Sequence, residues 1–191
     1  MYEDITCRYF EKPGPKNTKD AMEAASRRAS LLGIGTVVVA TSSGRTAFEA
    51  VNMFGPGIKI IAVTHVTGFA KPNFQELSDE DRQKLESKGV FIFTGQHAFG
   101  GIGRSVRNKF GTYQVDEIVS NALKIFGQGT KVAIEIAMMA ADAGLVRTDE
   151  DIIAIGGSGK GADAALVLRP VNSANFFDLV VKEIICKPSI K

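Results

Sequence analysis

The sequence predicts an α/β fold: three α/β/α layers around a mostly parallel sheet, with an antiparallel C-terminal edge. The apolar runs at residues 37–39 and 58–63 lack polar alternation, which is typical of strands covered on both faces. Amphipathic helical stretches alternate with such runs in the order βαβα, which favours a parallel sheet. The run at 164–168 follows the strand expected at 152–156 too closely for a parallel crossover, so we expect it to be antiparallel.

The individual elements follow in chain order. Parallel strands are expected at residues 5–10, 36–40, 58–63, 90–94 and 152–156. Amphipathic stretches that end at glycines predict helices, which begin near Asn17 or Thr18, Thr46, Ser78, Val115 and Thr130. The last apolar segment, 176–185, predicts a strand with a bent start. The basic, glycine-rich segment 98–111 predicts a surface loop and a candidate lid.

The bulk composition is that of one soluble domain covering residues 1–191. Hydrophobic residues make up 45% of the chain, and the net charge of +2 is too small to favour nucleic acid or an anionic membrane as a partner. No signal peptide and no stretch of transmembrane length is visible, so the expected location is the cytoplasm. Cys7 and Cys186 lie near opposite ends of the chain, which argues against a disulfide framework.

A polar turn follows the strand expected at 36–40, and its sequence is Thr41-Ser42-Ser43-Gly44-Arg45-Thr46. In a parallel sheet this turn connects the end of a strand to the N-terminus of a helix. The free N–H groups and the dipole at a helix N-terminus favour an anion. The hydroxyls add donors, Arg45 adds a charged fork suited to phosphate, and Gly44 permits close approach. These residue types favour an anion site. The alternative is that Ser42 or Ser43 caps the helix while the other side chains are solvated.

Three more polar stretches follow strand ends, at residues 64–69, 94–97 and 156–163. Ligands of such sheets bind in the crevice outside the carboxyl ends of the strands. His65 and His97 are candidates for ligand hydrogen bonds, for a metal or for an ordinary polar contact. No third metal ligand has a sensible spacing, so we prefer a ligand contact to a metal.

The loop 156–161 fits neither the P-loop pattern nor the dinucleotide fingerprint, because the required glycine and helix are missing. It is either a flexible hairpin or a ligand wall, from which Ser158 and Asp163 would reach a polar edge. Glu135 stands near the edge of the apolar face of the helix expected at 130–143, so we interpret it as a boundary residue, and Asp142 is ambiguous. No Ser-His-Asp triad can be assigned.

The segment TSSGRTA, a helix and then IIAVT resembles the C-terminal α/β domain of pyruvate kinases, in which a turn of this type receives a phosphate of a sugar bisphosphate effector. The chain from YFEKPGP through THVTGF and GGSGKGADAA resembles stand-alone archaeal proteins described as pyruvate kinase α/β-domain-like. This resemblance implies the fold, a phosphate site and bound FMN, without an established reaction. Pyruvate kinase activity itself is not expected, because in the family that chemistry lies on a separate barrel domain.

The expected function is therefore binding of a phosphorylated small molecule, with FMN as the cofactor. The alternatives are a flavin-dependent oxidoreductase and a sugar-phosphate sensor or interaction module without catalysis, and a homo-oligomer is an open alternative to a single chain. The candidate binding residues are Thr41, Ser42, Ser43, Gly44, Arg45, Thr46, His65, Thr67, Gly68, Gln96, His97, Gly156, Gly157, Ser158, Gly159 and Asp163.

Overall fold

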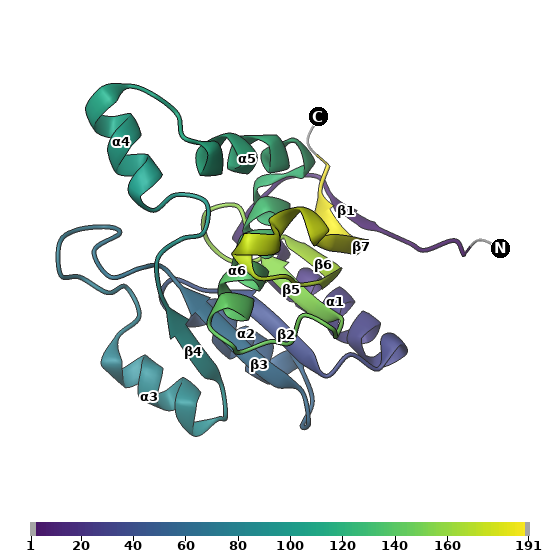
Figure 1. Cartoon of the computed structure of the whole chain (residues 1–191). Coiled ribbons are helices and arrows are strands. Elements are labelled where there is room, and N and C mark those ends of the chain that lie inside the picture. Colours follow the sequence, from purple (N-terminus) through teal and green to yellow (C-terminus); the bar gives the residue numbers. More distant parts are fainter. Residues whose placement is uncertain (1–2, 190–191) are drawn as a thin grey trace.

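The computed structural model describes residues 3–189, and within them seven strands form one sheet in the order β1-β7-β6-β5-β2-β3-β4 (Figure 1). The strands are β1 (Arg8–Phe10), β2 (Thr36–Ala40), β3 (Lys59–Thr64), β4 (Phe91–Thr94), β5 (Ile152–Gly156), β6 (Ala164–Arg169) and β7 (Val180–Pro188). The α-helices are α1 (Thr18–Leu32), α2 (Arg45–Met53), α3 (Asp79–Ser87), α4 (Ile102–Phe110), α5 (Val115–Leu123) and α6 (Gln128–Asp142). The 3-10 helices are η1 (Pro15–Asn17), η2 (Lys124–Phe126) and η3 (Ser173–Asp178).

The sheet has the predicted direction of strands. Strands β5, β2, β3 and β4 are parallel neighbours, so their carboxyl ends share one edge. Strand β6 runs antiparallel to both β5 and β7, and β1 then pairs in parallel with β7. The predictions of a mostly parallel sheet and of an antiparallel C-terminal part are confirmed.

Helices cover both faces of the sheet, which gives the three predicted layers. Val37 and Val39 point toward α1 and α2, whereas Val38 points to the opposite face, where α6 packs. All three valines are fully buried. Two covered faces leave no position in the strand for polar side chains, and this explains the unbroken apolar run. No helix among residues 3–189 is long and apolar enough to cross a lipid bilayer.

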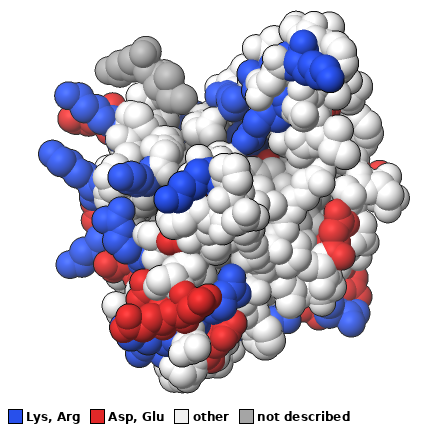
Figure 2. Space-filling model, turned by 90° about the vertical axis from the view of Figure 1, so that its left-hand side faces the viewer, with Lys and Arg blue, Asp and Glu red and all other residues white. Residues whose placement is uncertain are grey.

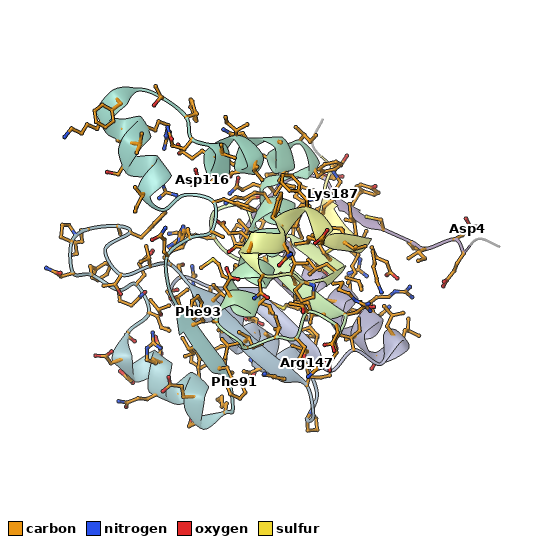
Figure 3. The ribbon with its side chains drawn as sticks, viewed as in Figure 1. Asp4, Phe91, Phe93, Asp116, Arg147 and Lys187 are labelled. Carbon is orange, nitrogen blue, oxygen red and sulfur yellow. The ribbon has the colours of Figure 1, made fainter. Side chains whose placement is uncertain are left out.

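The segment 98–111 is not the predicted loop, because most of it forms helix α4. Ile102, Val106 and Phe110 recur every four residues and give one apolar stripe, but the flanking glycines conceal this pattern in the sequence. None of its residues is buried, and α4 projects from the body beside α5 (Figure 1). Asp116 of α5 lies at the base of α4 (Figure 3), and a Cβ placed on Gly103 would come within 2.5 Å of its carboxylate.

Other boundaries differ from the prediction by a few residues. The first strand is limited to Arg8–Phe10, and α6 already begins at Gln128. The bent start of the last segment is the helix η3, which precedes β7. Neither predicted cap of α1 forms: the Asn17 amide donates to the carbonyl of Lys12, and no side chain of the described residues caps the helix.

Candidate functional site

Two adjoining cavities open where the parallel strands end. The main crevice, of about 410 Å³, lies on the α6 side of the sheet, and the side pocket, of about 190 Å³, lies between the starts of α1 and α2. Thr41, Ser42, Thr46 and Gly161 line both cavities. The predicted turn is therefore the wall between them, and a crevice of this volume is in the size range of small-molecule sites.

The turn leaves its polar groups free toward these cavities. Thr41 is buried, and its Oγ1 accepts a hydrogen bond from the N–H of Gly44 at 3.1 Å. Gly44 takes φ of 89° at the N-cap of α2, a conformation that favours glycine, and its neighbour Leu77 would lie 2.9 Å from an added Cβ. Within residues 3–189, the hydroxyls of Ser42 and Ser43 have no hydrogen-bond partner and do not cap α2. The alternative of a simple serine cap is therefore wrong.

Two basic side chains line the side pocket. Arg45 and Lys160 line it together with Ser43, and Glu49 supplies the one carboxylate among its lining residues. In the part of the chain that the structure describes, neither Arg45 nor Lys160 makes an ion pair within 4.0 Å. Two unpaired cations beside a helix N-terminus create a positive potential that favours an anion.

Only part of the glycine-rich loop lines the main crevice. Gly157 and Gly159 line the main crevice, whereas Ser158 lines a separate depression near the chain ends. Gly156 is buried against α6, so that an added Cβ would lie 2.2 Å from the carbonyl oxygen of Gly129. Asp163 is fully buried and does not line the crevice. Its carboxylate instead accepts hydrogen bonds from backbone N–H groups and braces the loop.

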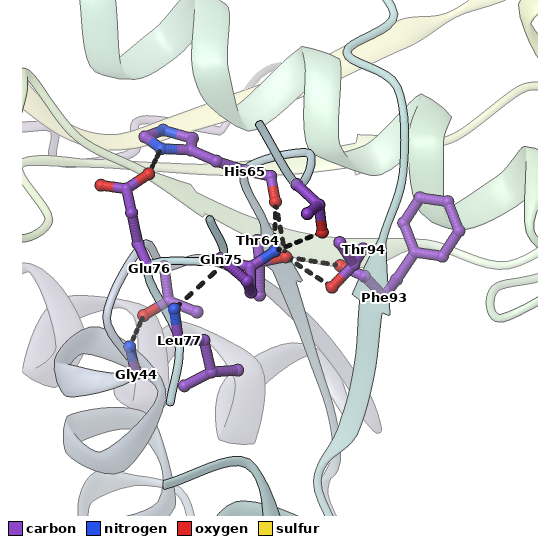
Figure 4. Close-up of polar contacts among 10 residues, drawn as sticks. Gly44, Thr64, His65, Gln75, Glu76, Leu77, Phe93 and Thr94 are labelled. Carbon is purple, nitrogen blue, oxygen red and sulfur yellow. Dashed lines mark hydrogen bonds and ion pairs between the residues drawn. The ribbon is translucent and has the colours of Figure 1, made fainter. Parts of the chain in front are cut away.

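His65 and His97 face the main crevice, as predicted, and form a cluster with Phe69. The ring centroids of the two histidines are 5.4 Å apart, and Phe69 lies 4.2 Å from His65 and 5.1 Å from His97. His65 Nδ1 is 2.5 Å from a carboxylate oxygen of Glu76, which fixes its ring (Figure 4). Burial lowers the pKa of His97, and the nearby carboxylate of Glu135 partly offsets this effect.

Several predicted residues lie outside the crevice wall. Thr67, Gly68 and Gln96 are exposed and line neither cavity. Thr64 does line the main crevice, and its hydroxyl also lies 2.7 Å from that of Thr94, which joins β3 to β4 (Figure 4). Among residues 3–189 there is no group of three or more metal-ligating side chains.

Three charged residues that sequence reasoning did not assign to the site also line the main crevice, namely Arg104, Lys131 and Glu135. Glu135 is only 6% exposed, so the interpretation as a boundary residue is wrong. It pairs with Lys131, one turn earlier on α6, and accepts the N–H of Phe99 at 2.9 Å. The detectable signal was an acid and a base four residues apart on an otherwise apolar helix.

The surface near the crevice is basic on one side. Figure 2 shows basic side chains gathered at the top of one face, over α4, and acidic side chains lower down, over α3. Arg104 belongs to α4 and lies over the ring of Phe69, with 5.1 Å between the guanidinium carbon and the ring centroid. The main crevice therefore opens beside the basic helix.

A protein-family comparison matches most of the chain. Residues 19–168 match the family described as pyruvate kinase, alpha/beta domain. A Cryptosporidium parvum pyruvate kinase in complex with ADP is 19% identical, with a TM-score of 0.42, over 81% of this chain and 24% of its own. A second pyruvate kinase structure from Cryptosporidium parvum is 16% identical, with a TM-score of 0.40, over 78% of this chain and 22% of its own. The chain spans about a quarter of the length of these solved structures. Because the family match covers most of the chain, the resemblance expected from the turn and its strands is confirmed: the chain belongs to the pyruvate kinase α/β domain family.

Proposed function

We propose that this protein binds a phosphorylated small molecule, with the phosphate on the turn 41–46 and FMN as the first candidate ligand. The observation that carries the proposal is that several hydrogen-bond donors of this turn have no acceptor in the described protein. The hydroxyls of Ser42 and Ser43 and the N–H groups of residues 45–47 have no protein partner within residues 3–189. All of them belong to the first turn of α2 or directly precede it, where the helix dipole also favours an anion.

FMN suits this arrangement through the rest of the main crevice. The α6 wall has an apolar surface, from Val132, Ile136 and Met139, beside an ion pair. The ring cluster of His65, Phe69 and His97 also lines the crevice. A flat ring is accommodated between an apolar wall and an aromatic one. The sequence resemblance to stand-alone proteins with bound FMN is the second support. We place this binding in the cytoplasm.

The test compares FMN with riboflavin, which lacks the phosphate. Both are titrated against the wild type, Ser43→Ala and Arg45→Ala, with binding followed by quenching of flavin fluorescence. A hydrogen bond to a charged group is worth about 1.5–3 kcal/mol, so each variant should bind FMN roughly tenfold to a hundredfold more weakly. Riboflavin should be nearly unaffected.

The exposed Arg27 of α1 provides the matched control, because Arg27→Ala removes the same charge away from both cavities. It should leave the affinity for FMN unchanged. Equal binding of the two flavins by the wild type, or a parallel loss of both in the two variants, would contradict a phosphate site at this turn.

A further inference from the structure

The Lys131–Glu135 pair stands out among the polar groups of the main crevice. Both side chains are nine-tenths buried, at 9% and 8% exposure, and both line the crevice. The remaining crevice-lining residues of α6 beyond its first turn are apolar. An ion pair this deeply buried loses hydration, and well-packed apolar residues in its place are often neutral or stabilising. Its contribution to stability alone therefore gives little reason for its presence.

The two side chains of the pair differ in how many of their hydrogen-bonding groups have a partner. Both oxygens of Glu135 are engaged, one by Lys131 and the other by the N–H of Phe99. The ammonium of Lys131, in contrast, has three N–H groups, and Glu135 is its sole hydrogen-bond partner within residues 3–189. The ring of Phe99, with its centroid 5.4 Å from Nζ, is a weak neighbour that still leaves a donor for another acceptor. A buried donor without a partner is costly. The N–H of Lys131 that has no hydrogen-bond acceptor in the described residues thus points to an acceptor that enters the crevice.

The groups around Lys131 favour an oxygen-rich, electron-rich acceptor. Glu135 balances the charge of one cation, and Arg104, which has no ion-pair partner in the described residues, adds a second. His97 also lines the crevice, and its ring makes no hydrogen bond to protein atoms of residues 3–189. The net charge of Lys131, Glu135 and Arg104 is positive, and all three lie on the crevice wall formed by α4 and α6.

We propose that Lys131 is the second anchor of the ligand: it donates to a carbonyl or anionic oxygen on the ring of the phosphorylated molecule whose phosphate occupies the turn 41–46. Glu135 is a positioning residue that holds the ammonium in place. The inference rests on the proposed function and adds the chemical class of the other end of the ligand. The end of the ligand that contacts Lys131 is a planar ring with an oxygen-bearing edge, as in a flavin. A simple sugar phosphate lacks such a ring.

The test uses a variant that removes the ammonium without leaving an unpaired buried charge. Lys131→Met combined with Glu135→Gln keeps an amide oxygen for the N–H of Phe99 and replaces the charged pair with groups of similar size. The probes are FMN and ribitol 5-phosphate, which is FMN without its ring. We expect the double variant to bind FMN about tenfold to a hundredfold more weakly, because a charge-assisted bond is lost. Its affinity for ribitol 5-phosphate should stay unchanged.

A matched control is available on α3, where Glu80 and Lys84 form an exposed ion pair with the same spacing. Glu80→Gln combined with Lys84→Met should leave both affinities unchanged. The inference is overturned if the crevice variant binds FMN like the wild type, if it loses both probes in parallel, or if the wild type does not bind FMN. Failure of the phosphate site looks different: Arg45→Ala would then leave both probes unaffected, whatever Lys131 does. The midpoint of thermal unfolding shows whether the variant is folded.

Discussion

The carboxylate of Asp163 accepts a hydrogen bond from the backbone N–H of Gly14 at 2.8 Å and so joins segments 149 residues apart. The same oxygen lies 3.3 Å from the N–H of Ser158, in the glycine-rich loop. Asp163 is fully buried and directly precedes β6. One carboxylate thus holds the N-terminal turn against the loop that borders the main crevice.

We expect Asp163→Ala to lower the free energy of unfolding by about 1–3 kcal/mol, because the buried N–H of Gly14 loses its acceptor. Asp163→Asn keeps an acceptor oxygen and should cost less. The measurement is urea-induced unfolding of each variant. Asp178, which is exposed, supplies the control, and Asp178→Ala should change stability by no more than about 0.5 kcal/mol. Equal effects at the two positions would contradict the bracing role.

The approach of β5 to α6 leaves no room for a side chain at Gly156. A Cβ there would lie 2.2 Å from the carbonyl oxygen of Gly129 and 2.7 Å from the amide nitrogen of Ala133, and neither backbone atom can move cheaply. Gly156→Ala should therefore destabilise the protein by about 1–3 kcal/mol. Gly35→Ala is the matched control, because no atom of residues 3–189 lies within 4 Å of its added Cβ. Thermal unfolding of both variants checks this, and a Gly156→Ala protein as stable as Gly35→Ala would contradict it.

The sequence predicts those parts of the molecule that depend on local patterns. The apolar run at 37–39 predicts a strand that is covered on both faces. The polar residues of the turn 41–46 are contiguous in the chain, so a candidate anion site can be predicted from the sequence alone. Helix α4 was not predicted because the glycines around its start and after its end conceal its apolar stripe. Lys131 and Glu135 were not assigned to the site for another reason. Whether the edge of a helix faces solvent or a crevice depends on the elements that pack beside it, and the helix sequence does not contain this information. Asp163 shows the opposite error. The sequence predicts that it contacts a ligand, but the structure buries it, and its carboxylate accepts hydrogen bonds from backbone N–H groups.

The lowered pKa of His97 should make the free energy of unfolding depend on pH. Burial lowers its pKa below the ordinary 6.5, so between these two values the unfolded chain binds a proton that the folded chain does not. The contribution of His97 to stability is complete above pH 6.5 and declines as the pH falls toward its folded pKa. Unfolding in urea from pH 5 to 8 should therefore show a steeper loss below about pH 6.5 for the wild type than for His97→Gln. Identical profiles would show that His97 does not contribute.

The two cysteines should differ in reactivity even though both are free thiols. Burial raises the pKa of Cys186 to about 12, and it raises the pKa of Cys7 as well, although Cys7 is only half-buried. Because the thiolate is the reactive form, iodoacetamide at pH 8 should label Cys7 slowly and Cys186 only after denaturation. Mass spectrometry of tryptic peptides measures both rates. Prompt labelling of Cys186 in the folded protein would contradict its buried position.

Helix α4 should be the segment whose hydrogen exchange responds most to ligand. None of its residues is buried, so its amides should exchange quickly in the free protein, whereas α6, with most of its residues buried, should be strongly protected. Arg104 brings α4 to the main crevice, and a ligand that contacts this side chain would hold the helix in place. Exchange at residues 102–110 should therefore slow on addition of FMN.

Helix α3 is the internal control for this experiment, because it is also a nine-residue surface helix but lines neither cavity. Its exchange should not respond to FMN. Mass spectrometry of peptides from the two helices, with and without a saturating ligand, gives the comparison. If α4 and α3 respond alike, or if α4 ignores a ligand that binds, then α4 is not a lid over the crevice and Arg104 does not contact the ligand.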